Sequence, residues 1–147
     1  MRVRILLAGA LPLWLICALS LGEAQEAPAL SPLTQQQMRS FPDIQQAIVA
    51  ITGYDSRGVE LTTTGHQLVV TLFNSKLLDA QSSVRETEAS KIVEGVTKVV
   101  APRPEFKTVS SIRIDYVKCQ AEDDHSHLED SIEFRRAADG TFRHHIS

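Results

Sequence analysis

The strongest hydrophobic pattern of the chain lies at its beginning. Two arginines precede an almost unbroken apolar run from Ile5 to Leu21, and small residues follow this run. A basic start, an apolar middle and small residues at the cleavage position are typical of a secretory signal peptide. We therefore expect residues 1–24 to be a signal peptide. The working chain would then begin near Gln25, in an exported compartment that is periplasmic or extracellular.

Two alternatives for the same segment stay open. About 20 apolar residues can span a bilayer, so the segment could remain uncleaved as an anchor. Cys17 could instead carry a lipid, although three bulky residues precede it, where a lipoprotein signal has small ones. Pro12 and the small residues at the end of the run favour cleavage. Membrane contact is expected only if the leader is retained or lipidated.

The next segment, residues 25–40, is expected to be a flexible leader, because residues 25–33 contain two prolines and show no hydrophobic period. A single domain is expected over residues 41–147. Its first helix is predicted from Pro42 to Thr52, and Gly53 supplies the stop. Apolar residues recur there at helical spacing: Ile44, Ala47, Ile48 and Ile51. A glutamine-rich tract precedes Pro42 and could extend this helix, but the proline favours a break.

Two β-branched runs, Val59–Thr63 and Gln67–Phe73, follow at close spacing. The short connection between them contains a glycine, so the pair predicts a β-hairpin. In the second run the apolar residues Leu68, Val70 and Leu72 alternate with the others. Alternation places these three on one face of a strand. One face of the sheet should therefore be covered and the other more open.

A longer helix is predicted from Ser83, where Ser83 and Glu86 have the spacing of a capping box. Its apolar positions run down one side: Ala89, Ile92, Val93, Val96, Val99 and Val100. Gly95 lies in its middle, where glycine costs up to about 1 kcal/mol relative to alanine. A close approach to the sheet would explain this glycine.

Three further strands complete the prediction. The first covers residues 107–118, and a polar loop follows over 122–130. A hairpin is then expected from strands 131–136 and 141–146, because Asp-Gly between them is a strong turn signal. The fold class is α+β, with a small mixed, mostly antiparallel sheet of about five strands and two helices packed on one face.

The run Gln67–Phe73, a polar link and the long predicted helix together resemble the opening of an OmpA-like peptidoglycan-binding domain. That family binds through an aspartate and an arginine in a loop after its second strand. No counterpart of this motif follows Ile112–Tyr116. The resemblance is therefore one of pattern, and it implies no ligand for this chain.

Composition argues against a nucleic-acid partner. The formal net charge is −3 and aromatic residues make up 5% of the chain. Nucleic-acid binding needs a basic surface, and single-stranded nucleic acid also needs aromatic stacking platforms. The oligomeric state is left open.

Metal binding is the first chemistry that the sequence suggests. Cys119, Asp123, Asp124, His125 and His127 lie within one short stretch, and His144 and His145 follow near the end. Imidazole and thiolate are ligands for zinc or copper. We therefore name His125, His127 and Cys119 as candidate metal ligands. The spacing matches no closed structural site, and Cys119 is more commonly a buried, inert thiol.

No catalytic motif is present that would make the chain an enzyme by pattern. A nucleophile elbow and a glycine-rich phosphate loop are both missing. Cys119 with a histidine, or a serine with His66, would be the residual nucleophilic alternatives. We expect an exported, non-catalytic binding or accessory module without a cofactor, with a possible protein partner. A metal-binding protein that uses the His125/His127 loop is the alternative.

Overall fold

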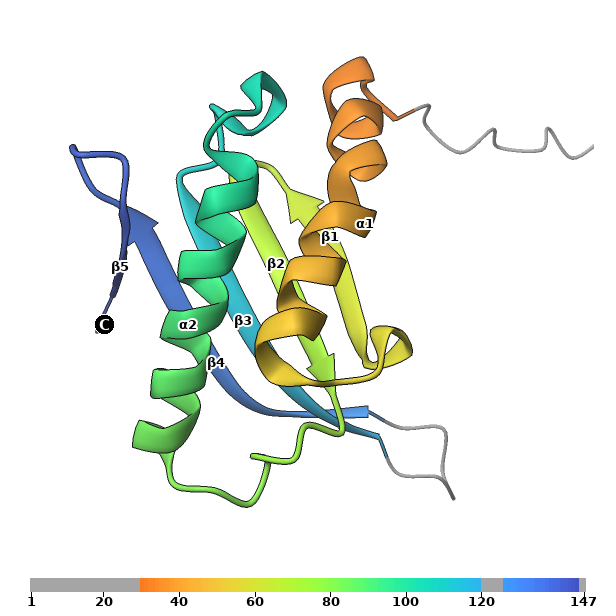
Figure 1. The fold of residues 1–147 in the computed structure, drawn as a ribbon, viewed down its shortest axis with the longest axis vertical. Coiled ribbons are helices and arrows are strands. Elements are labelled where there is room, and N and C mark those ends of the chain that lie inside the picture. The colour runs from red at the N-terminus through yellow and green to blue at the C-terminus, as the bar shows by residue number, and fades with distance from the viewer. Residues whose placement is uncertain (1–29, 120–125, 146–147) are drawn as a thin grey trace, which may run out of the picture.

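The computed structural model describes residues 30–119 and 126–145, and its fold is α+β, as predicted. Five strands form one sheet in the order β1-β2-β3-β4-β5. Their bounds are β1 Val59–Thr64, β2 Gln67–Phe73, β3 Ser111–Cys119, β4 Ser126–Arg136 and β5 Phe142–His144. The α-helices are α1 Pro32–Thr52 and α2 Ser82–Val100, with short 3-10 turns at Ser56–Gly58 and Pro104–Phe106 (Figure 1).

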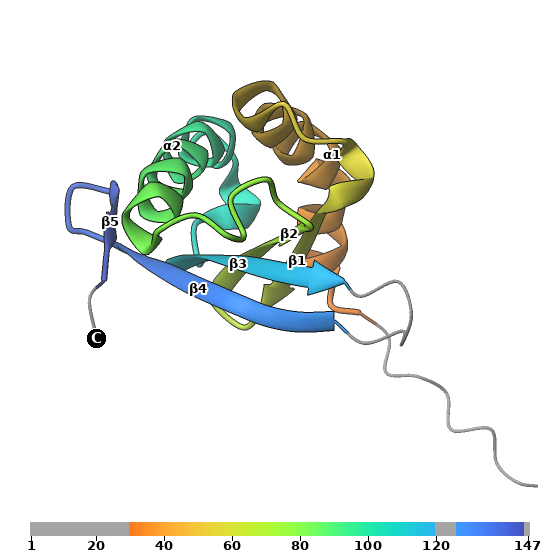
Figure 2. The same cartoon turned by 90° about the horizontal axis from the view of Figure 1, so that it is seen from below.

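The sheet is mixed. β2 and β3 are parallel neighbours joined through α2, whereas the other pairs are antiparallel. Both helices lie on the same side of the sheet, so the molecule has two layers (Figure 2). The predicted hairpins are present: Gly65 has φ 61 in the β1–β2 turn and Gly140 has φ 83 in the last one. Both glycines adopt the left-handed backbone region that other residues avoid.

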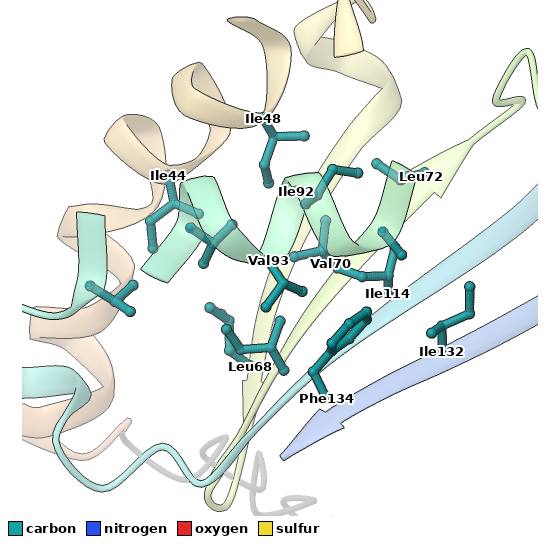
Figure 3. Close-up of a cluster of buried hydrophobic side chains, with 14 of the residues drawn as sticks. Ile44, Ile48, Leu68, Val70, Leu72, Ile92, Val93, Ile114, Ile132 and Phe134 are labelled. Carbon is teal, nitrogen blue, oxygen red and sulfur yellow. The ribbon is translucent and has the colours of Figure 1, made fainter. Parts of the chain in front are cut away.

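The core lies between the helices and one face of the sheet (Figure 3). The predicted alternation of β2 is confirmed, because Leu68, Val70 and Leu72 are fully buried on the helix side. Ile112, Ile114 and Tyr116 of β3 share that face and are also fully buried. Each such aliphatic side chain contributes about 1.5–3 kcal/mol when it leaves water. This burial, rather than local propensity, stabilises the layer arrangement.

The first helix begins ten residues earlier than predicted, at Pro32, and Pro42 lies inside it. Residues 32–40 are therefore helical and do not form a leader; residues 25–29 lie outside the described part. Ser31 caps the helix by accepting from Thr34 N–H at 3.1 Å. The turns before Pro42 are held by a distant residue, since Gln37 Nε2 donates to Glu105 O and Ser40 Oγ donates to Glu105 Oε1, both at 2.8 Å. These buried bonds offset the one that Pro42 cannot donate.

The start of α2 and the role of Gly95 also differ from the prediction. Gln81 occupies the N-cap without a side-chain hydrogen bond, so the capping box of Ser83 and Glu86 is not formed. Gly95 allows a close approach, but to α1 rather than to the sheet. A Cβ on residue 95 would overlap Cδ1 of Ile51.

The bounds of β3 and β4 differ from the prediction. Residues 126–130, predicted as polar loop, extend β4 because they pair with the end of β3. β3 itself begins at Ser111, because the residues before it form a turn in which Val109 N–H donates to Phe106 O at 3.1 Å. A register shift between Tyr116 and Val117 marks a bulge in the β3–β4 pair. Pairing between strands, which a single segment cannot reveal, decides these boundaries.

Candidate binding edge

The outer strand β1 exposes backbone groups that no other strand pairs. Asn74, directly after β2, donates its N–H to Val117 O at 2.8 Å. The backbone N–H and C=O groups of even-numbered β2 residues therefore point toward β3. The backbone groups of odd-numbered β2 residues point toward β1, where their register partners are Glu60, Thr62 and Thr64. It follows that the N–H and C=O groups of Leu61 and Thr63 point away from the sheet. Within the described residues these groups have no hydrogen-bond partner.

The beginning of the same edge is closed by α1. Gln45 Nε2 donates to Ser56 O at 2.8 Å and to Val59 O at 2.7 Å. Val59 N–H donates to Ser56 O inside the short 3-10 turn. Because both backbone groups of Val59 are occupied, the open stretch starts at Leu61.

A groove of about 280 Å³ runs between α1 and β1 beside this open stretch. Its lining residues are Met38, Phe41, Pro42, Gln45, Val59, Glu60 and Leu61. Met38 is 47% exposed although it is a large apolar side chain. An extended chain that paired with β1 could therefore also place side chains against apolar surface.

The opposite edge of the sheet is guarded. β5 pairs with the end of β4 only, and His145 N–H adds a bond to Glu133 O at 2.8 Å. Farther along β4, Ser131 N–H is taken by Asp130 Oδ1 at 2.9 Å, and the bulge against β3 follows. Bulges and inward-held charges are devices that prevent edge pairing. β1 is thus the more accessible of the two edges.

A polar cluster joins the end of α1 to α2 and β3. Tyr54 Oη donates to Glu88 Oε2 at 2.8 Å and lies 2.7 Å from Ser75 Oγ, while Tyr116 Oη lies 3.2 Å from Glu88 Oε1. Burial is the largest cause that raises the pKa of Tyr54, to about 12, and Glu88 adds to it. Burial and then the charge of Glu88 raise the pKa of Tyr116 as well. Both phenols therefore stay protonated donors, and the cluster connects elements rather than supplying a base.

Arg85 completes this polar region. Its Nε donates to Asp130 Oδ2 at 2.7 Å, and its Nη1 donates to the carbonyls of Leu78 at 3.0 Å and Ala80 at 2.5 Å. The segment between β2 and α2 is thus bound back to the fold. Its carbonyl groups offer less to a partner than those of β1.

Two grooves larger than the α1–β1 groove lie elsewhere. One of about 500 Å³ runs between α2 and β5, over Val93, Phe134 and Phe142. Its charged rim pairs internally: Lys98 with Glu94 at 2.8 Å and Arg143 with Asp139 at 2.7 Å. A second groove of about 490 Å³ lies between the helices. The groove beside β5 borders outward backbone groups of Phe142 and His144, because the odd-numbered residues of β5 pair with β4. β5 has only three residues, and very short edge strands limit strand addition, so β1 is the stronger candidate.

The predicted metal ligands are only partly brought together. Cys119 ends β3 opposite Ser126, and His127 lies opposite Lys118. Adjacent positions alternate between faces, so the Cys119 and His127 side chains point to opposite sides of the β3–β4 ribbon. Cys119 is exposed rather than buried, because it lies at the strand end beyond the helices.

The remaining metal candidates add no cluster within the described part of the chain. Asp123, Asp124 and His125 lie outside it, and no group of three or more potential ligands gathers among the described residues. His144 stacks on Phe134 with ring centroids 5.4 Å apart. His66, the candidate base, lies with Nδ1 3.0 Å from Thr108 O. A site built on His125 and His127 stays a prediction.

Sequence reasoning missed the residues of the β1 edge. Part of the signal for this edge is present in the sequence. Val59–Thr63 is predicted as the first strand of a hairpin, and such a strand often lies at the edge of a sheet. The sequence could not reveal that Met38 lies beside it, since residues 32–40 were expected to be outside the fold.

Neither of the two α-helices in the described part of the chain has the length and hydrophobicity of a membrane-spanning segment. Comparison of the chain with family models, curated proteins and solved structures finds no match in any of the three.

Proposed function

We propose that the chain is an exported, non-catalytic binding module that captures an extended segment of a partner protein by strand addition at β1. One observation carries this proposal: the outward N–H and C=O groups of Leu61 and Thr63 lie unpaired beside the α1–β1 groove. The basic and apolar beginning of the chain supports export.

Strand addition suits this edge for a physical reason. Backbone hydrogen bonds along a sheet edge supply affinity that depends little on sequence, and neighbouring pockets add selectivity. Leu61 and Thr63 together offer two donors and two acceptors in one line. Gln45 fixes the start of this line against α1, so the edge is ordered before a partner arrives and less entropy is lost on binding.

The test is a binding assay with a fluorescent seven-residue peptide that alternates valine and lysine. Thr63→Pro removes the outward N–H and places a ring where the partner strand would lie, while the bonds to β2 stay intact. We expect a loss of affinity of about tenfold, as for one or two lost hydrogen bonds. Thr63→Val keeps the N–H and should bind as the wild type does.

N-methylation of the probe provides the second arm. Methyl groups on the amides that face β1 remove the donors of the peptide without changing its charge. Strand addition predicts loss of binding for this probe. Equal affinity for the methylated and unmodified probes, or unchanged binding by a folded Thr63→Pro variant, would show that the backbone is not what is recognised.

A further inference from the structure

We infer that the β1 edge selects partner segments in which apolar side chains alternate with basic ones. This inference rests on the strand capture proposed above and adds the chemistry of the captured segment. It follows from the two different surfaces that an added strand would meet.

On the helix side, the added strand meets apolar surface. Val59 and Leu61 direct their side chains toward the core, so alternate residues of a neighbouring strand would share that face. There they reach the α1–β1 groove, where Met38 is 47% exposed and Phe41 is half-buried. A polar side chain at these positions would lose water without gaining a partner.

On the open side, the added strand meets Glu60. This residue is exposed, and within the described residues its carboxylate forms no ion pair and accepts no side-chain hydrogen bond. Its register partner on β2 is Thr71, which is neutral. Opposite charges on directly paired strand positions attract, and like charges repel. A lysine or arginine across from Glu60 would complete this edge.

A second copy of the chain is a poorer occupant for the same reason. β1 reads Val-Glu-Leu-Thr-Thr-Thr and contains no basic residue. Antiparallel pairing of two β1 strands would leave both Glu60 carboxylates without a cation. Charge complementarity therefore favours a segment of a different protein.

The experiment compares two peptides that differ only in charge: valine alternating with lysine, and valine alternating with glutamate. Fluorescence anisotropy at low salt should give about fivefold tighter binding for the lysine probe, from one attractive pair in place of one repulsive pair. The difference should shrink as salt is added, because Glu60 is exposed. Glu60→Lys should reverse the preference. Glu129→Lys is the matched control, since Glu129 is exposed on the guarded edge and its change should leave the preference unaltered.

The outcomes separate this inference from the strand capture beneath it. Equal, N-methylation-sensitive binding of both probes would overturn charge selection and leave strand capture standing. Binding that resists N-methylation would overturn both. A dimer seen by sedimentation that disappears in Thr63→Pro and excludes both probes would make a second copy the occupant, and would also overturn the inference. Circular dichroism of each variant checks that it is folded.

Discussion

Tyr54 donates a hydrogen bond of 2.8 Å to Glu88, and this bond connects the end of α1 to α2. The hydroxyl also contacts Ser75 Oγ at 2.7 Å. One phenol thus connects the end of α1, the segment after β2, and α2.

Alkaline pH should weaken this connection. Folding raises the pKa of Tyr54 from its ordinary 10.0 to about 12, so the native state holds the proton more tightly than the unfolded chain. The stabilisation is fully present below pH 10.0 and is lost as pH rises toward about 12. The free energy of unfolding of Tyr54→Phe should therefore fall less with rising pH than that of the wild type over this range. Urea unfolding at several pH values measures the difference, and identical pH slopes would contradict the assignment.

Gly95 and Ile51 should show coupled effects on stability. Gly95→Ala gains up to about 1 kcal/mol of helix propensity, but the new Cβ meets Cδ1 of Ile51. Ile51→Val removes that atom, so we expect the alanine to stabilise the protein more in the Ile51→Val background than in the wild type. Ile51 is 41% exposed, which lets its tip move and keeps the penalty moderate. A double-mutant cycle by urea unfolding measures the coupling, and additive effects would refute the close approach.

Arg85 should contribute much more than an ordinary surface arginine. Its side chain is 14% exposed and pairs with Asp130, and it also holds carbonyls of the segment before α2. Arg85→Met leaves these groups without a donor, so we expect a loss of roughly 2–4 kcal/mol in the free energy of unfolding.

The control for Arg85 is an exposed pair of the same type. Arg57 pairs with Asp55 at 3.1 Å, but its side chain is 89% exposed. Arg57→Met should lower the free energy of unfolding far less than Arg85→Met does, because water screens the exposed pair. Similar losses for both variants would mean that burial does not distinguish the two pairs.

Metal binding has a direct thermal test. If His125 and His127 hold zinc or copper, the metal raises the melting midpoint of residues 25–147, and His125→Ala/His127→Ala abolishes the rise. Cys119→Ser should leave the rise intact, because Cys119 and His127 point to opposite faces. An unchanged midpoint in the wild type would retire the metal hypothesis.

The leader has a test of its own. Expression of the full chain in a host that exports it should give a mature protein that begins at Gln25, and its intact mass checks this. Retention of residues 1–24 in a membrane fraction would favour the anchor, and a mass increase on a chain that starts at Cys17 would favour lipidation.

The sequence alone determined those features that depend on neighbouring residues. The alternation of Leu68, Val70 and Leu72 assigned the covered face, and Gly53 and Gly140 marked a helix end and a turn, because side-chain period and backbone freedom act within a few residues.

Only the tertiary structure decided the features that depend on distant partners. Pro42 favoured a break, yet Glu105 holds the turns before it. Gly95 gave no sign that α1 is its neighbour, and Val59–Thr64 could not reveal which of its backbone groups stay open. Local preferences amount to tenths of a kcal/mol up to about 1 kcal/mol for most residues, whereas buried contacts between remote segments contribute more and therefore override them.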